Sequence, residues 1–252
     1  MQESPVERNR CFLKDSVRKT IDFSRTDQSL GFAPPPIEKP YSPNAERIDL
    51  ISPDKFRTLP GVDLLYAIEN RRSHRQFADS PLTLEELSFL LWATQGMQGQ
   101  PGAAHARRTV PSAGSRHALE TYLCVLNVKG LDTGFYRYLP LEHQLLVECR
   151  DERAGEKTGR AALQQNCMAG AAAIFIWSAI PYRMEWRYGL AAHKVILLDA
   201  GHVCQNLYLA CEVANAGACA VAAYDQELVD QLLRIDGKDE FVIYLAAVGK
   251  VN

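Results

Sequence analysis

The sequence lacks the short motifs by which many common enzyme classes are identified. No GxGxxG fingerprint follows a strand pattern, and no Walker A loop, HExxH motif or GxSxG motif occurs in the 252 residues. The six histidines do not have the spacing of metal ligands. These absences argue against a Rossmann dehydrogenase, a P-loop NTPase, a zinc protease and a serine hydrolase, and we expect no metal site.

An excess of charge of one sign is also missing. The chain has 28 Lys+Arg against 30 Asp+Glu, which gives a formal net charge of -2 at pH 7. A protein that binds nucleic acid or an anionic membrane through its overall charge would be strongly basic. We therefore expect neither partner, and any anion site must be a local cluster of cations.

Paired cysteines and long apolar runs are missing too. The seven cysteines include no CxxC pair, which argues against a zinc ribbon or a redox pair of that type. Cys204 and Cys211 lie two helical turns apart in an apolar pattern, so we expect them to be buried as small hydrophobic side chains. The longest apolar stretch, residues 169–180, is too short to span a bilayer, and the first residues have no apolar signal-peptide core. We expect a cytoplasmic protein.

Prolines, by contrast, are concentrated in the first 60 residues, and they include the run Pro34-Pro35-Pro36. Each proline removes a backbone donor and restricts the residue before it, so this segment cannot form long helices. We expect residues 1–60 to be an extended arm that lies on the body of the protein or on a partner subunit. Residues 61–252 would then form one domain.

Regular patterns begin after residue 61. Thr83 and Glu86 have the spacing of a capping box, so a helix is predicted to begin there and to end at Gly96. Other predicted helices are 62–72, 152–166, 191–216 and 226–233, and the predicted strands are 121–128, 134–138, 143–149, 171–178, 218–223 and 241–248. Because several strands follow one another through short connections, the fold class is α+β with a central, largely antiparallel sheet flanked by helices.

The predicted helix 191–216 is apolar around most of its circumference. Such a helix must be buried, either at the centre of the domain or in a subunit interface. His202 lies inside this pattern, and we expect it to be a buried helix histidine rather than a catalyst.

The densest basic cluster is Arg71-Arg72-Ser73-His74-Arg75, just past the first regular helix. Guanidinium groups bind phosphate oxygens in pairs, and a serine hydroxyl adds a directional donor. The alternative is a solvated C-terminal turn, where cations also suit the helix dipole. Phe77 and Pro81-Leu82 return the chain to the core and would hold the cluster firmly, which favours a binding site.

Two further segments could contribute to such a site. Residues 111–117, PSAGSRH, form a loop of small polar residues before a predicted buried strand. Small residues let backbone amides approach a ligand closely, although an ordinary turn with an N-cap at Ser115 fits equally well. Gly249-Lys250 places one cation at the end of the last strand.

Taken together, the motif RRSHRQF at 71–77 resembles the phosphate-binding motif of the FMN-dependent nitroreductase superfamily. Residues 84–96, 111–117, 199–207 and 240–250 further resemble its SagB-type branch, which includes thiazoline and oxazoline dehydrogenases. The resemblance implies a nitroreductase-like fold and a homodimer with two FMN sites, in which the long buried helix lies at the interface. The cofactor-binding residues that it implies are Arg71, Arg72, Ser73, Arg75, Ser112, Ser115, Ala222, Ala223 and Lys250.

The resemblance also implies the chemistry. The expected function is an FMN-dependent oxidoreductase that transfers hydride between NAD(P)H and a small acceptor, such as a nitroaromatic compound or a quinone, through flavin N5. One alternative is an azoline dehydrogenase of natural-product peptide modification, and another is a flavin-binding protein without turnover. Tyr188 and Lys194 are the implied proton-transfer residues, although Ala191-Ala192 stand where that branch has Arg-Gly. Tyr188 could equally be a packed interface tyrosine.

Overall fold

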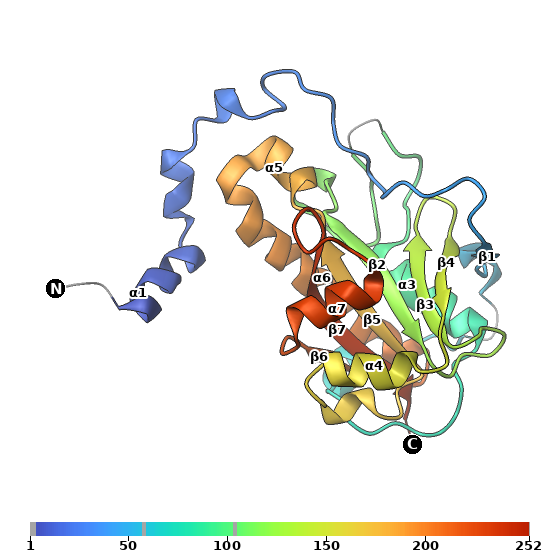
Figure 1. The fold of residues 1–252 in the computed structure, drawn as a ribbon. Coiled ribbons are helices and arrows are strands. Elements are labelled where there is room, and N and C mark those ends of the chain that lie inside the picture. The colour runs from blue at the N-terminus through green and yellow to red at the C-terminus, as the bar shows by residue number, and fades with distance from the viewer. Residues whose placement is uncertain (1–3, 57–58, 103–104, 252) are drawn as a thin grey trace.

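The fold is built on one antiparallel sheet, seen in a computed structural model that describes residues 4–56, 59–102 and 105–251 (Figure 1). Within these residues seven strands have the spatial order β1-β4-β3-β2-β5-β7-β6, and neighbouring strands are antiparallel throughout. Their bounds are β1 (Arg47–Asp49), β2 (Leu119–Val125), β3 (Gly134–Leu139), β4 (Gln144–Arg150), β5 (Ala173–Ala179), β6 (Ala216–Val221) and β7 (Phe241–Lys250). The expected fold class, α+β with a central antiparallel sheet, is confirmed.

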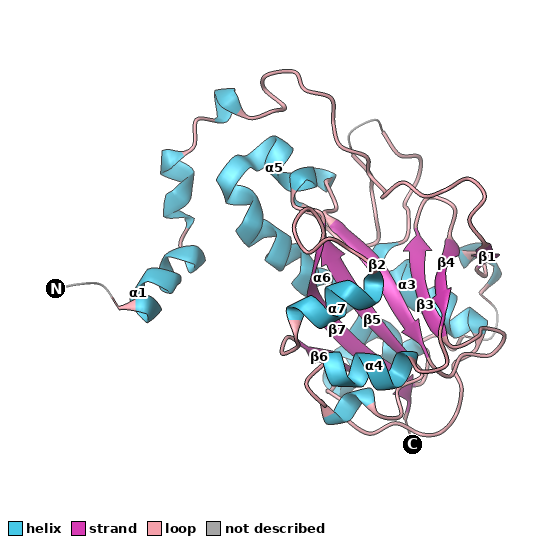
Figure 2. Ribbon diagram, viewed as in Figure 1, coloured by secondary structure: helices cyan, strands magenta, loops and turns pink. Residues whose placement is uncertain are grey.

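Helices cover both faces of this sheet (Figure 2). On one face lie α3 (Leu84–Gln95) and α6 (Ala192–Val213), and on the other lie α4 (Ala154–Ala161) and α7 (Gln226–Leu233). Side chains alternate along a strand, so Leu123 packs with the first pair of helices whereas Tyr122 and Cys124 pack with the second. The central strands are consequently buried on both sides.

Local signals set the ends of α3 as the sequence predicts. The Thr83 hydroxyl accepts a hydrogen bond from the Glu86 amide, and the Glu86 carboxylate accepts one from the Thr83 amide, at 3.1 and 2.8 Å. Gly96 is the C-cap, and its N–H donates to the Trp92 carbonyl at 2.7 Å. A Cβ at position 96 would lie 2.2 Å from the Trp92 side chain, so only glycine fits this close approach.

Helix α6 is buried along one side only. Cys204 and Cys211 are buried, as expected. Leu197 and Leu198, in contrast, remain 47% and 54% exposed in the single chain, and His202 is exposed as well, so its predicted burial is wrong. An apolar pattern shows that a helix needs cover but does not show whether its own chain supplies it.

Helix α2 (Leu64–Asn70) has a similar open surface. Its exposed apolar side chains are Leu64, Leu65, Tyr66 and Ile68. We use the term open apolar surface for these four residues together with Leu197 and Leu198 of α6.

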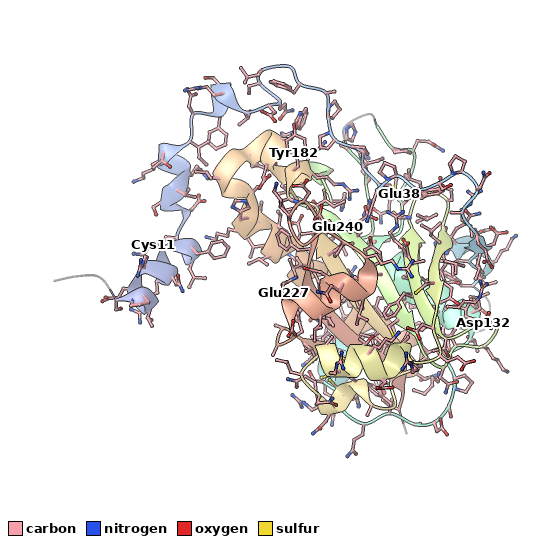
Figure 3. All side chains as sticks on the ribbon, viewed as in Figure 1. Cys11, Glu38, Asp132, Tyr182, Glu227 and Glu240 are labelled. Atoms are coloured by element: carbon pink, nitrogen blue, oxygen red, sulfur yellow. The ribbon has the colours of Figure 1, made fainter. Side chains whose placement is uncertain are left out.

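The N-terminal segment forms only short helical turns, starting with α1 (Pro5–Arg10), and leads away from the sheet (Figure 1). Figure 3 shows Cys11 on this segment, well separated from Glu38 and Glu240. Further along, β1 pairs with β4, so part of the first 60 residues joins the sheet. That strand was not predicted, since three residues among prolines carry little periodic signal.

Two element boundaries differ from expectation for clear reasons. The predicted helix 152–166 ends at Ala161 because Leu163 and Gln164 adopt the left-handed conformation, with φ of 52° and 56°. The predicted strands near 121–128 and 218–223 lie about two residues earlier, as β2 and β6. No helix in the described part of the chain is long and apolar enough to cross a membrane.

Candidate functional site

The basic segment 71–75 runs from the end of α2 along the edge of β6. Ser73 forms a parallel bridge with Ala218, and the His74 N–H donates to the Ala218 carbonyl at 2.9 Å. A Cβ on Gly217 would come within 2.6 Å of the His74 ring, so glycine permits this close approach. Backbone pairing thus fixes the position of the segment.

Tyr208, from α6, connects three parts of this region. Its hydroxyl lies 3.0 Å from the Ser73 hydroxyl and accepts a hydrogen bond from the Ala220 N–H at 2.9 Å. The guanidinium of Arg71 stands over its ring, 5.4 Å from the centroid, in a cation–π contact. Tyr208 itself is only 9% exposed. A buried tyrosine therefore holds the two neighbouring side chains of the motif in place.

Arg75 lines a cavity of about 280 Å³ beside the end of β6. Ala222 and Ala223 line the same cavity, so the structure brings together these three residues of the predicted site. Gln165 and Asn166 complete its polar lining. Position 75, like position 73, is exposed.

Arg71 and Arg75 have no carboxylate within ion-pairing distance among the residues that the structure describes. Unpaired guanidinium groups beside a serine hydroxyl form the donor set that a phosphate monoester prefers. The chemistry of Arg71, Ser73 and Arg75 therefore fits the phosphate of FMN. We call these three residues the phosphate cradle.

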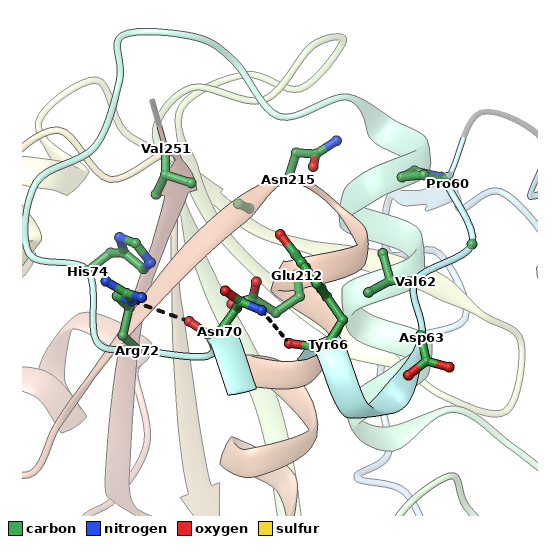
Figure 4. Close-up of a pocket in the computed structure, with 12 residues that line it drawn as sticks. Pro60, Val62, Asp63, Tyr66, Asn70, Arg72, His74, Glu212, Asn215 and Val251 are labelled. Atoms are coloured by element: carbon green, nitrogen blue, oxygen red, sulfur yellow. Dashed lines mark hydrogen bonds between the residues drawn. The ribbon is translucent and has the colours of Figure 1, made fainter. Parts of the chain in front are cut away.

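Arg72 lines a different cavity from Arg75. It lines a larger cavity of about 790 Å³ together with His74, Tyr66, Asn70 and Glu212, and Figure 4 shows this arrangement. Its Nε donates to the Asn70 carbonyl at 3.4 Å. The structure thus separates Arg72 from Arg75, although only two residues lie between them in sequence.

Lys250 is already engaged within the chain. Its ammonium donates to the Glu86 carboxylate at 2.8 Å and to the Ala214 carbonyl at 2.7 Å. Lys250 thereby joins the end of β7 to the start of α3 and to the C-cap of α6. These contacts stabilise the junction of β7, α3 and α6.

Ser112 and Ser115 lie on a loop that packs against another part of α6. The Ala113 N–H donates to Asp199 Oδ1 at 3.4 Å, and Ser112 Oγ accepts from the His117 N–H at 2.9 Å. Burial raises the pKa of Asp199, whose second oxygen has no partner among the described residues. The loop is therefore anchored to α6 through Asp199.

His117 holds the other side of this loop. Its Nε2 lies 2.9 Å from the Ala106 carbonyl, and burial, with the nearby Arg108 charge, lowers the pKa of His117 to about 3. The imidazole is thus neutral at physiological pH and donates a structural hydrogen bond.

The two groups of predicted residues occupy opposite margins of α6. Asp199, beside Ser112, and Tyr208, beside Ser73, are nine residues apart, which in an α-helix is about 13 Å along the axis and about 180° around it. Helix α6 therefore stands between the loop and the cradle, and none of the cavities described above contains residues of both. Neither of these two cavities joins the predicted serines to the cradle within one chain.

Tyr188 and Lys194 also lie apart from the cradle. Tyr188 ends α5 (Tyr182–Tyr188), beneath the Arg187 guanidinium, and its hydroxyl would lie 2.5 Å from a Cβ on Gly114. The Lys194 ammonium donates to the Leu13 carbonyl of the N-terminal arm at 2.7 Å. The structure thus places Tyr188 next to the serine loop and Lys194 against the arm.

Solved structures define the class of fold. The structure of a Ralstonia eutropha protein described as a nitroreductase matches with a TM-score of 0.67 and 24% identity over 88% of this chain and 95% of that one. The Escherichia coli microcin synthetase McbBCD complex with truncated pro-MccB17 contains a chain that matches with a TM-score of 0.61 and 21% identity, over 83% and 79% of the two chains. For the Vibrio harveyi NADPH:FMN oxidoreductase complexed with NAD+, the values are 0.51 and 15%, over 75% and 69%. The fold is nitroreductase-like.

Sequence comparison identifies the family. The Nitroreductase family model matches residues 68–250, and a Methanocaldococcus jannaschii protein named as a nitroreductase is 36% identical over 180 residues, covering 71% of this chain and 87% of the relative. The trifolitoxin-processing protein TfxB of Rhizobium leguminosarum bv. trifolii is 26% identical over 136 residues, 52% of this chain and 36% of TfxB. The chain belongs to the nitroreductase family and is an oxidoreductase of that family.

Proposed function

We propose that this protein is an FMN-dependent oxidoreductase that takes hydride from NAD(P)H and passes it to a small organic acceptor such as a nitroaromatic compound or a quinone. The observation that carries the proposal is the phosphate cradle, where two arginines without internal counter-charges flank a fixed serine. Membership of the nitroreductase family supports the reaction class. When bound, FMN supplies a carrier for two electrons and one proton between donor and acceptor.

The residues of the chain would bind and orient that group. Arg71, Ser73 and Arg75 would hold the phosphate, and the backbone at Ala222 and Ala223, beside Arg75, would lie near the ring. Cations close to the ring would stabilise the negative charge that reduction adds. Lys250 would stabilise the elements behind the cradle, and Tyr188 would move a proton only if substrate reaches the serine loop.

A homodimer would complete the site. The cradle and the serine loop lie on opposite margins of α6, and the open apolar surface of α2 and α6 is exposed in the single chain. Several large apolar side chains exposed on two helices are typical of subunit interfaces. We propose that two chains pack through this surface, so that Ser112 and Ser115 of one approach the cradle of the other.

Mixed dimers test the arrangement. A dimer of one Arg71→Ala chain and one Ser112→Ala/Ser115→Ala chain, purified through two different tags, would contain one doubly impaired site and one intact site. We expect it to bind one FMN with the affinity of the unmodified protein and a second FMN much more weakly. Two impaired sites, with no site of unmodified affinity, would contradict the shared site, because each chain would then carry its own complete site.

The reaction is tested on the purified protein. We expect a yellow protein that contains FMN and is bleached anaerobically by NADH or NADPH, with recovery of colour on adding a nitroaromatic compound or a quinone. A colourless protein that binds no FMN at micromolar concentration would contradict the proposal. Bound FMN that neither nucleotide reduces would favour the alternative, a flavin-binding protein without turnover.

The second candidate function is oxidation of an azoline during peptide modification. It is favoured by the similarity to TfxB, a trifolitoxin-processing protein, and by the likeness in fold to a chain of the microcin synthetase complex. Membership of the SagB-type branch is part of this proposal. Conversion of a thiazoline or oxazoline peptide to the azole, measured as a loss of 2 Da with oxygen as acceptor, would support it, and the absence of any such product would contradict it.

We further propose that residues 1–60 act as an arm around a body formed by residues 61–252. The arm places Leu13 against Lys194, and a cytoplasmic location would suit the free cysteines, of which Cys11 is exposed. Fractionation of cells, followed by immunodetection, tests the location.

A further inference from the structure

The hydroxyl of Tyr208 is a buried polar group whose bonding is set by its neighbours. A tyrosine hydroxyl has one hydrogen to donate and lone pairs to accept with. The Ala220 N–H donates to Tyr208 Oη at 2.9 Å, so the backbone of β6 occupies an acceptor position. The hydroxyl hydrogen still needs an acceptor, since a buried donor without a partner is costly.

Ser73 is the acceptor that the structure provides. Its Oγ lies 3.0 Å from Tyr208 Oη, and within residues 4–56, 59–102 and 105–251 no other acceptor is bonded to that hydroxyl. If Ser73 donated instead, the buried tyrosine would have two donors directed at it and no acceptor for its own hydrogen. The arrangement consequently favours donation from Tyr208 to Ser73.

Donation in that direction determines what Ser73 offers to a ligand. With its oxygen accepting from Tyr208, the serine has its own hydrogen left to donate, and position 73 is exposed while Tyr208 is buried. Hydrogen bonds in a chain also polarise one another, so each strengthens the next. The Tyr208 ring also lies beneath the Arg71 guanidinium, so that Tyr208 orients two residues of the cradle, Ser73 and Arg71.

Resting on the proposed function, we propose that Tyr208 is a positioning residue that makes the site selective for a phosphorylated flavin. The relay runs from the Ala220 N–H through the Tyr208 hydroxyl to Ser73, whose hydrogen is donated to a phosphate oxygen of the ligand. Riboflavin, which has no phosphate, gains nothing from the relay. Tyr208 itself touches no ligand and acts through Ser73 and Arg71.

The test compares the affinities of FMN and riboflavin for the full-length protein, freed of flavin and titrated by flavin fluorescence. Tyr208→Phe keeps the ring beneath Arg71 and removes only the hydroxyl. We expect it to weaken FMN binding about tenfold, the effect of one hydrogen bond to a charged group, and to change riboflavin binding less than about twofold. Tyr136→Phe is the matched control, because the Tyr136 hydroxyl donates to the remote Asp132 carbonyl at 2.7 Å.

The double variant shows whether Tyr208 and Ser73 act through one relay or contribute to FMN binding independently. Ser73→Ala should reproduce the selective loss, and Tyr208→Phe/Ser73→Ala should lose little more than either change alone. Equal losses for both flavins, additive losses, or no loss in Tyr208→Phe would overturn the relay while leaving FMN binding intact. A protein that binds neither flavin before any substitution would overturn the proposed function and the relay with it. If Tyr208→Phe does not fold, Ser73→Ala still decides, since parallel losses of FMN and riboflavin contradict phosphate selectivity.

Discussion

Arginines in two regions of the sheet have opposite surroundings. Around the buried Glu120 at the start of β2, which we call the paired end, Arg183 and Arg137 are 2% and 1% exposed, and both are paired with that carboxylate. Beside β6, which we call the unpaired end, Arg71 and Arg75 have no carboxylate partner among the described residues. The same residue type is therefore held in buried ion pairs in one place and has no such pair in the other, where we propose that it binds a ligand.

The paired end fastens the chain that precedes the domain to the sheet. Glu120 accepts from Arg183 Nη2 at 2.6 Å and from the Lys39 N–H at 3.0 Å, while Arg137 donates to the Lys39 carbonyl at 3.0 Å. Burial opposes ionisation there, but Arg183 and Arg137 outweigh it and hold the pKa of Glu120 below its usual value. The lesson is that only the surroundings of an arginine, and not its presence in the sequence, distinguish a structural ion pair from a cation that is open to a ligand.

The largest effect should follow from breaking the paired end. Arg183→Met leaves Glu120 buried and short of a partner, so we expect the free energy of unfolding to fall by about 3–5 kcal/mol. Arg150→Met is the matched control, since Arg150 pairs with Glu46 on the surface and such pairs contribute about 0–1 kcal/mol. Urea unfolding at one fixed protein concentration measures both. An equal, small loss in the two variants would contradict the contrast between buried and exposed pairs.

At the unpaired end the same kind of substitution should affect binding rather than stability. We expect Arg71→Ala and Arg75→Ala each to weaken FMN binding by about 1.5–3 kcal/mol, or roughly 10- to 150-fold. The thermal midpoint of the flavin-free protein should change little, because neither arginine has an ion pair to lose with any residue that the structure describes. Arg160→Ala, on the exposed side of α4, serves as the control. Full flavin occupancy in both variants would refute the phosphate assignment.

Glu38, near the paired end, is buried and has no ion pair among the residues that the structure describes. Burial, with help from Glu142 and Glu120, raises the pKa of Glu38 from 4.5 to about 7, although the Leu141 N–H bonds to it. The native state then binds more protons than the unfolded state between about pH 4.5 and 7, so this group makes stability fall as pH rises through that window.

Replacing Glu38 with its neutral isostere should remove that loss. We expect Glu38→Gln to raise the free energy of unfolding by about 1–2 kcal/mol at pH 8 and to leave it nearly unchanged at pH 4. Thermal unfolding at the two pH values gives the difference. A variant that is less stable at pH 8 would show that the carboxylate is needed in its charged form.

The smallest effect is expected at Arg72, which is not one of the cradle residues and has no ion pair in the described part of the chain. Because it faces the cavity with His74 and Glu212, Arg72→Ala should change FMN affinity by less than about threefold, the energy of a weak, exposed contact. A loss as large as that of Arg71→Ala would show that Arg72 turns toward the ligand on binding. Equilibrium titration of Arg72→Ala and Arg71→Ala with FMN under the same conditions distinguishes these outcomes.

Some of the fold and part of the site could be predicted because their signals are local. The capping box at Thr83, the glycine at 96 and the short connections between strands act over a few residues, so they set the ends of α3 and the antiparallel order of β2, β3 and β4. The arginine–serine motif at 71–75 could also be found from the sequence, because its residues are neighbours in the chain. The early end of α4 and the exposure of His202 were not, since backbone strain and missing cover depend on packing.

The sequence by itself determined the order of most elements from α2 to β7, the near-neutral charge and the cluster of cations at 71–75. Only the tertiary structure decided which arginines are paired, that Lys250 is held by Glu86, and that Tyr208 reaches Ser73 across 135 positions of sequence. It also placed the serine loop and the cradle on opposite margins of α6. The physical reason is that caps and periodicity act between neighbours in the chain, whereas charge pairing and hydrogen-bond direction arise only where distant segments meet.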